Sequence, residues 1–164
     1  MPRDFAFTLQ YESPVERVYA ALVDVERWRR RVAGAANVDL VFGAAEPGAF
    51  EVTVTERGAV PAPLRRVVKG EFGLTRTDRW GPVESGTARG TFTGTAVGVG
   101  GTFSGTYLLR AAGPGSAVDV AGSLRVDVRG LGGALESMAE KLLTKIVRGE
   151  RDDVEAWIGA HQNV

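Results

Sequence analysis

Residues 11–28 read YESPVERVYAALVDVERW, and their spacing predicts where the first helix of the chain begins. Ser13 is placed to cap that helix, Pro14 suits the first helical position, and Glu16 is placed to complete a capping box. The apolar residues that follow share one helical face, which predicts a short amphipathic helix. They are Val15, Val18, Tyr19 and Leu22.

A second short helix follows in the same stretch. Asp24 is a favoured N-cap residue, and Val25, Trp28 and Val32 recur behind it at helical spacing. Gly34 then stops the pattern, because glycine favours helix ends. The stretch therefore predicts a pair of short helices early in the chain.

An alternating segment precedes this helix pair at residues 4–11. Phe5, Phe7, Leu9 and Tyr11 fall on one side of it, and polar or small residues fall on the other. Alternation with a period of two residues is typical of a strand with one buried face.

Six further alternating segments follow the helix pair, so we expect about seven strands in all. They are residues 38–42, 50–55, 71–80, 87–97, 102–111 and 117–129. Turns rich in glycine and proline join most of them, with residues 43–48 as the first hairpin turn. The pattern predicts a meander of antiparallel strands.

Residues 61–68 do not fit the meander. Pro61 and Pro63 resist a central strand, whereas Leu64 and Val67 among basic residues suit a short amphipathic helix. We expect a lid-like segment here.

Two near-duplicate strings flank a glycine turn: GTFTGT at 90–95 and GTFSGT at 101–106. They are expected to face each other as hairpin strands. A hairpin that closes around residues 99–100 sets Phe92 opposite Tyr107 and Ala96 opposite Phe103, all on the inner face.

The inner face of the later strands also carries small residues. Gly90, Gly94 and Gly105 leave space there, either for close approach of a helix or for a bound molecule.

Arg76 and Asp78 share the parity of Leu74 and would also point inward on a regular strand. Buried charges must be paired, so an inward orientation implies a mutual salt bridge, trapped water or a polar ligand group. A bulge after Leu74 would instead turn both side chains outward.

The last long segment predicts one helix from residue 131 to about residue 158. Its apolar residues fall along one stripe: Leu131, Leu135, Met138, Leu142, Ile146, Val154 and Trp157. Such a helix would extend about 40 Å, long enough to cross a twisted sheet. We therefore predict an α+β helix-grip fold, in which a curved antiparallel sheet wraps a long C-terminal helix as a single domain over residues 1–164.

Composition narrows the classes of function. The formal net charge is +0 and no long apolar run occurs, so we expect no nucleic-acid partner and no stable membrane insertion. Cysteine is absent, and the N-terminus lacks the apolar run of a signal peptide, which favours a cytoplasmic protein.

We expect no metal, no cofactor and no catalytic residue. The single histidine, His161, lies in the C-terminal tail. The carboxylates near the end of the chain interleave with Arg148 and Arg151 as on a solvated helix face: Glu150, Asp152, Asp153 and Glu155. Two basic groups are also interpreted as solvated: Arg27, Arg29, Arg30 and Arg31, and Arg65, Arg66 and Lys69.

The order strand, two short helices, meander and long helix resembles the START-like (Bet v 1-like, SRPBCC) superfamily. The residues that carry the resemblance are Ser13, Pro14, Val18, Asp24 and Trp28. Within that superfamily the chain is similar to the bacterial DUF2505 family, on the strand end TRTDRW at residues 75–80 and the helix start GGALE at 132–136. The resemblance implies a hydrophobic cavity between sheet and helix, without naming a ligand.

The leading hypothesis is binding or transfer of a small hydrophobic molecule, lipid-like or polyketide-like, in that cavity. The candidate ligand-binding residues are Phe7, Leu40, Phe42, Phe50, Val52, Leu74, Arg76, Asp78, Trp80, Phe92, Tyr107, Leu109, Met138 and Leu142. One alternative is a cyclase or hydrolase that uses Arg76, Asp78 and Tyr107. Another is a protein-interaction module with a closed cavity and an unknown protein partner.

Overall fold

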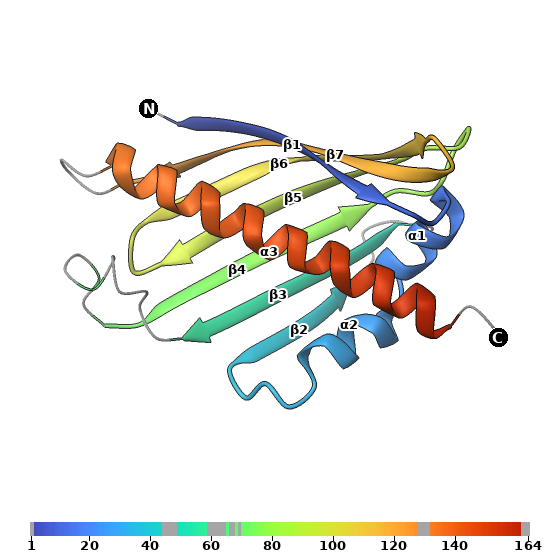
Figure 1. Ribbon diagram of the computed structural model, residues 1–164. Helices are drawn as coiled ribbons and strands as arrows, with labels where there is room; N and C mark the ends of the chain where they lie inside the picture. The colour runs from blue at the N-terminus through green and yellow to red at the C-terminus, as the bar shows by residue number, and fades with distance from the viewer. Residues whose placement is uncertain are drawn as a thin grey trace.

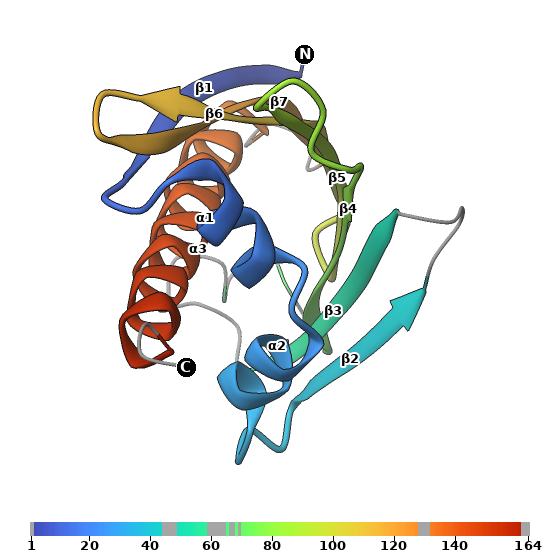
Figure 2. The same ribbon diagram turned by 90° about the vertical axis from the view of Figure 1, so that its right-hand side faces the viewer.

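Seven antiparallel strands form one sheet that curves around a long helix (Figures 1 and 2). A computed structural model describes residues 2–43, 49–58, 65, 68, 70–127 and 132–161. The elements are β1 (Arg3–Tyr11), α1 (Val15–Leu22), α2 (Val25–Val32), β2 (Val38–Gly43), β3 (Phe50–Gly58), β4 (Phe72–Trp80), β5 (Ala88–Val97), β6 (Gly101–Ala112), β7 (Gly115–Val126) and α3 (Gly132–Ala160). The predicted helix-grip fold is confirmed.

The strand order places β1 and β2 at opposite edges of the sheet, in the order β1-β7-β6-β5-β4-β3-β2. The chain crosses between these edges through α1 and α2, which lie together at one end of the sheet (Figure 2). Among the described residues, no such helix lies beside the opposite end, where β4 and β6 begin (Figure 1). The two ends of the space under α3 therefore differ.

The turn predicted at residues 43–48 and the lid predicted at 61–68 fall largely outside the described residues. Only Gly43, Arg65 and Val68 of these two segments are described. The pairing that the first turn was expected to produce is present, because β2 pairs antiparallel with β3.

The helix starts agree only in part with the prediction. Asp24 caps α2 as expected, and its carboxylate accepts hydrogen bonds from the backbone N–H groups of Glu26 and Arg27 at 2.9 and 3.2 Å. The prediction of a capping box at Ser13 is wrong. Helix α1 begins one residue later, with extended Pro14 as its N-cap and no side-chain cap.

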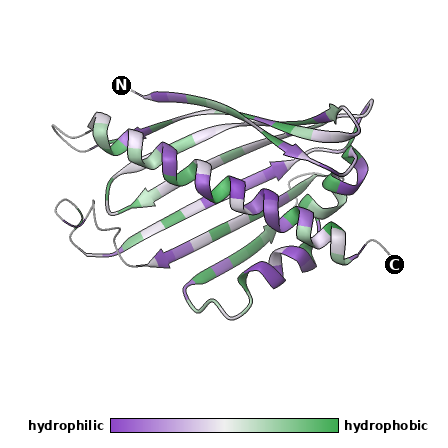
Figure 3. Cartoon of the chain, viewed as in Figure 1, coloured by the Kyte–Doolittle hydropathy of each residue, from purple (hydrophilic) through white to green (hydrophobic). Residues whose placement is uncertain are grey.

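Helix α2 is drawn mostly in the hydrophilic colour (Figure 3). Its sequence VERWRRRV leaves few apolar side chains, and Trp28 is the one that is fully buried. The Trp28 indole N–H also donates to the carbonyl of Leu22 at 2.9 Å. Trp28 is therefore the buried apolar side chain of this charged helix, beside buried Arg27.

Helix α3 spans 29 residues and crosses the concave face (Figure 1). Its buried side is Leu135, Leu143, Val147, Val154 and Ile158. The predicted stripe is therefore wrong in its middle part: Leu142 is 40% exposed, and Met138 and Ile146 are only partly buried. The buried residues and the more exposed stripe residues lie on adjacent sides of a helix with 3.6 residues per turn. Spacing alone therefore could not show which of the two sides is buried.

The length and hydropathy of the helices decide whether one of them could cross a membrane. Within the described part of the chain, no helix is both long and apolar enough to cross a lipid bilayer.

An aromatic cluster forms the centre of the core. The Phe92 ring lies 4.9 Å from the Tyr107 ring and 6.2 Å from the Phe5 ring, and Trp80 stacks on Tyr107 at 5.2 Å, measured between centroids. These four side chains are all buried. Rings at such distances contribute energy beyond their buried area, so the middle of the sheet is rigidly packed.

The hairpin register differs from the prediction by two residues. Phe92 lies opposite Gly105 and Gly94 lies opposite Phe103, rather than Phe92 opposite Tyr107 and Ala96 opposite Phe103. The inner face is the one expected. The observed register places each phenylalanine across from a glycine, which avoids a clash between two large side chains on one face.

The inner glycines accommodate aromatic rings. A Cβ atom on Gly94 would lie 2.0 Å from Phe103 Cζ, and one on Gly105 would lie 2.4 Å from Phe92 Cζ. At Gly90 the nearest side-chain atom would be Trp80 Cδ2 at 3.0 Å. The rings of this protein itself therefore fill the space that these glycines leave, so neither predicted use of that space is correct.

Replacement of Gly105 by alanine tests this packing. The added Cβ would also lie 2.3 Å from the backbone oxygen of Ala121, which cannot rotate away. We expect Gly105→Ala to lower the free energy of unfolding by about 1–3 kcal/mol in urea denaturation. The control is Gly159→Ala, where no atom lies within 4 Å. Equal stability of the two variants would contradict the packing described here.

Candidate functional site

An apolar pocket of about 220 Å³ lies between the first half of α3 and the end of the sheet away from α1 and α2. Strands β4 to β7 and the turn between β5 and β6 form its floor, and α3 forms its roof. The lining residues are Phe72, Leu74, Ala96, Val99, Gly101, Thr102, Phe103, Leu124, Arg125, Val126, Leu135, Met138, Ala139, Leu142, Leu143 and Ile146. We call it the first pocket.

A second pocket of about 220 Å³ lies on the other side of Leu74 and Ile146, which line both pockets. Helix α2, strands β2 to β4 and the middle of α3 enclose it. Its wall is partly polar, and the charged residues in it are Arg31, Glu56, Arg76 and Glu150. The two pockets together run along one flank of α3, apolar toward its start and polar toward its middle.

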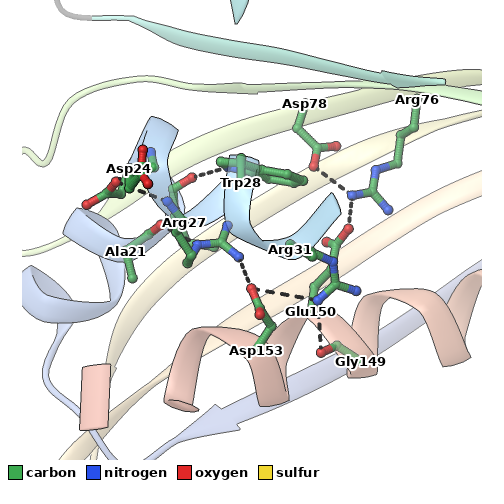
Figure 4. A network of polar contacts seen from close by, with 12 residues as sticks. Ala21, Asp24, Arg27, Trp28, Arg31, Arg76, Asp78, Gly149, Glu150 and Asp153 are labelled. Carbon is green, nitrogen blue, oxygen red and sulfur yellow. Dashed lines mark hydrogen bonds and ion pairs between the residues drawn. The ribbon is translucent and has the colours of Figure 1, made fainter. Parts of the chain in front are cut away.

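A buried ion cluster separates the second pocket from the aromatic core. The Arg76 guanidinium donates to Asp78 Oδ2 at 3.1 Å and also to the Glu150 carboxylate (Figure 4). The Tyr107 hydroxyl donates to Asp78 Oδ1 at 3.1 Å. Arg76 and Asp78 are each only 4% exposed, so of the two orientations considered the inward one is observed, and of the three possible partners the mutual salt bridge is present.

No bulge turns these charges outward. Strand β4 pairs without interruption from Phe72 to Trp80 with β3, so Arg76 and Asp78 keep the parity of Leu74. Glu150 reaches them from α3, and no local pattern in the sequence identifies it as their partner.

Burial changes the titration of the cluster. Desolvation raises the pKa of Asp78 from 3.8 to about 6, although the Arg76 charge opposes this rise. Desolvation and the neighbouring Asp78 carboxylate raise the pKa of Tyr107, so its hydroxyl stays protonated and donates. Burial by itself disfavours the charged Arg76, but Asp78 and Glu150 raise the pKa of Arg76 and keep it ionised.

A second ion cluster joins α2 to α3 (Figure 4). Arg27 is 1% exposed, donates from Nε to the carbonyl of Ala21 at 2.6 Å and forms an ion pair with Asp153. Arg31 lies 3.7 Å from the same carboxylate and donates to the Gly149 carbonyl at 3.4 Å. The prediction of fully solvated basic and acidic faces is therefore wrong for Arg27, Asp153 and Glu150, because α2 and α3 face each other here.

The predicted ligand-binding residues divide into groups. Leu74, Met138 and Leu142 line the first pocket, and Leu74 and Arg76 line the second. Asp78, Trp80 and Tyr107 border a space of about 30 Å³ under α3. The others lie away from both pockets, in the core or on the outer strands: Phe7, Leu40, Phe42, Phe50, Val52, Phe92 and Leu109.

Sequence reasoning missed several pocket residues. Phe103 was expected on the inner face but was not named as a pocket residue, and the period of two could also have placed Leu124 on that face. Leu135 and Leu143 carry the helical period of α3. Which inner-face residues border a space and which are covered depends on how α3 crosses the sheet.

Comparison with known proteins gives the family. The DUF2505 family, described as a protein of unknown function, matches residues 6–158. The chain belongs to the DUF2505 family. A relative in the same size range is the uncharacterised protein Rv0481c of Mycobacterium tuberculosis, 25% identical over 170 residues that cover 96% of this chain and 98% of the relative.

Solved structures share the fold of this DUF2505 protein. The Zhui aromatase/cyclase from Streptomyces sp. R1128 aligns with a TM-score of 0.59 and 15% identity, over 95% of this chain and 93% of that chain. Ara h 8.0201 aligns with a TM-score of 0.60 and 15% identity, over 98% and 99%. These likenesses agree with the helix-grip fold.

Removal of the central cation tests the first ion cluster. Arg76→Met leaves two partly or fully buried carboxylates without their cation, so we expect a loss of about 3–5 kcal/mol in the free energy of unfolding at pH 7. The matched control is Arg79→Met on the same strand, whose exposed ion pair with Glu51 contributes about 0–1 kcal/mol. Denaturant titration of both variants provides the comparison. A similar small loss for both would show that the cluster does not stabilise the fold.

The raised pKa of Asp78 predicts a pH dependence. Between pH 3.8 and about 6 the folded state binds this proton more tightly than the unfolded state does. The contribution of Asp78 to stability therefore falls as the pH rises through this window. We expect the free energy of unfolding of Asp78→Asn, relative to that of the unsubstituted protein, to increase as the pH rises from 4 to 7, because the amide carries no charge.

Asp119→Asn is the control for this pH profile. The hydrogen bond from Arg110 lowers the pKa of Asp119, so its contribution is present at neutral pH and is lost at acidic pH below 3.8. Denaturation series across pH should therefore show opposite trends for the two variants. A flat difference between Asp78→Asn and the unsubstituted protein would contradict the assignment.

Proposed function

We propose that this DUF2505 protein binds a small hydrophobic molecule in the first pocket, between α3 and the β4–β7 end of the sheet. The observation that carries the proposal is the almost wholly apolar wall of a space of about 220 Å³. Apolar cavities of this kind stay dry and accept apolar molecules, because water gains few hydrogen bonds inside them.

The position of the pocket supports access from solvent. Leu142 lines it and is 40% exposed, so an apolar side chain stands at its rim. Exposed large aliphatic side chains next to an apolar hollow are typical of ligand-binding grooves.

The comparisons agree with this proposal at the level of fold. One of the similar solved structures is named an aromatase/cyclase. At 15% identity this likeness supports a scaffold able to enclose a small molecule and transfers no reaction.

Binding accounts for the site better than catalysis does. Arg76, Asp78 and Tyr107 are bonded to one another, and the space that Asp78 and Tyr107 border measures about 30 Å³. That volume suits a water molecule rather than a substrate. The Asp78 carboxylate accepts from both Arg76 and Tyr107, as buried polar groups in a core do.

The interaction-module alternative assumes a closed cavity. Two spaces of about 220 Å³ lie along α3 instead, and one of them reaches partly exposed Leu142. We therefore propose a molecule as the occupant rather than a protein partner on a solid surface.

A charge at the rim tests the proposal. Leu142→Asp places a carboxylate where a bound molecule would desolvate it, so we expect affinity for the neutral probe N-phenylnaphthylamine to fall about tenfold or more. The matched control is Val41→Asp on β2, where the valine is 64% exposed and borders neither pocket. Probe fluorescence measures both, and mass spectrometry of organic extracts of the purified protein identifies any retained molecule. Unchanged affinity in Leu142→Asp would exclude the first pocket as the site.

A further inference from the structure

Two lysines of α3 stand beside the rim of the first pocket. Lys145 follows pocket-lining Met138 by seven residues and Leu142 by three, so it shares their face of the helix. Lys141 lies one turn before Lys145 on the same side. Side chains on a helix lean toward its N-terminus, which directs Lys145 back toward partly exposed Leu142. Both lysines are exposed, so their ammonium groups lie in water next to an apolar opening.

The charge of these two lysines is not neutralised within the described part of the chain. Neither forms an ion pair with another described residue, and Glu140, the carboxylate next to Lys141, pairs with Arg3 instead. The residues three or four positions from each lysine include no carboxylate, whereas Arg148 adds a further cation. At a spacing of four residues the two lysines also repel each other. An anion between them would remove that repulsion.

The charged groups of the sheet near the pocket are occupied elsewhere. Arg125 belongs to the pocket wall, but its guanidinium pairs with Asp127 at 2.9 Å. Glu71 comes directly before pocket-lining Phe72, and it borders a separate hollow with Thr75, whose side chain has the opposite parity to the inner face. The excess charge at the rim beside Leu142 is therefore positive.

The interior of the first pocket sets the other half of the requirement. Its wall is almost wholly apolar, so a carboxylate inside it would lose its hydration and find no partner. An aliphatic chain is favoured in the same space, because its burial removes apolar surface from water. A molecule with both parts therefore has one favourable orientation, with the chain inside and the charge at the rim.

We propose that the first pocket takes a single-chain amphiphile with an anionic head, of the fatty-acid class. The chain lies in the pocket, and the carboxylate lies at the rim beside Lys145 and Lys141. This inference rests on the proposed function. It adds the chemical class of the ligand and its orientation.

Three amphiphiles of one chain length test the proposal on the whole protein. Octanoate, octanol and octylammonium carry a negative, a neutral and a positive head at pH 7. Each competes with N-phenylnaphthylamine for the unsubstituted protein and for the double variant Lys141→Gln, Lys145→Gln. We expect the double variant to bind octanoate about three- to tenfold more weakly, because it lacks two exposed ion pairs. Octylammonium is expected to bind it more tightly, and octanol equally well.

Arg148→Gln is the matched control for removal of a positive charge from the same helix. The Arg148 guanidinium lies 5.8 Å from the centroid of the Phe7 ring on β1, and Arg148 lines neither pocket. We expect its octanoate affinity to change by less than about twofold, because salt screens exposed charges that are not in contact. The double variant loses a repulsive pair, so its stability in urea is not expected to fall. Weaker octanoate binding is then not a consequence of unfolding.

The outcomes separate this inference from the proposed function. If all three amphiphiles displace the fluorescent probe and the double substitution changes none of their affinities, the anionic head is wrong and apolar binding remains. Tighter binding of octylammonium than of octanoate to the unsubstituted protein leads to the same conclusion. If the double substitution abolishes binding to phosphatidylglycerol vesicles but leaves octanoate affinity unchanged, the lysines face a membrane surface and the inference is wrong. If N-phenylnaphthylamine and all three amphiphiles fail to bind, the proposed function is wrong as well.

Discussion

The ion pair between Arg76 on β4 and Glu150 on α3 is the contact on which the rest of the interior depends. It joins the middle of the sheet to the middle of the helix, and the Arg76 charge, buried between them, is kept from water. A buried cation must be neutralised by partners of good geometry, which restricts α3 to positions that bring Glu150 to Arg76. That restriction sets the height of the helix above the sheet and therefore the spaces beneath it.

Two kinds of packing meet at this contact. Toward α1 and α2 the interior is filled by aromatic rings, with Phe92 lying over Gly105 and Trp80 lying over Gly90 of the neighbouring strands. Toward the other end of the sheet, leucine and methionine side chains border a hollow. The close-packed interior near α1 and α2 gives the sheet a defined curvature. The pocket at the other end leaves room for a bound molecule.

The candidate site combines residues that are far apart in the chain and have different reasons to be there. Leu74 is an ordinary inward residue of β4, Ile146 lies on the flank of α3, and Arg31 belongs to a helix that buries Trp28. Local pattern explains each residue separately. Their meeting follows from the path of α3 across the sheet, and Asp153 supports that path by pairing with buried Arg27.

The type and order of the elements follow from local pattern, because alternation, helical spacing and capping act between near neighbours in the chain. The strands, the Asp24 cap and the inward parity of Arg76 and Asp78 were predictable for this reason. Three features required the tertiary structure: the register of the Phe92 hairpin, the face of α3 that is buried, and Glu150 as a partner of Arg76. Each depends on which bulky or charged groups fit together across a distance, and no spacing within one segment carries that information.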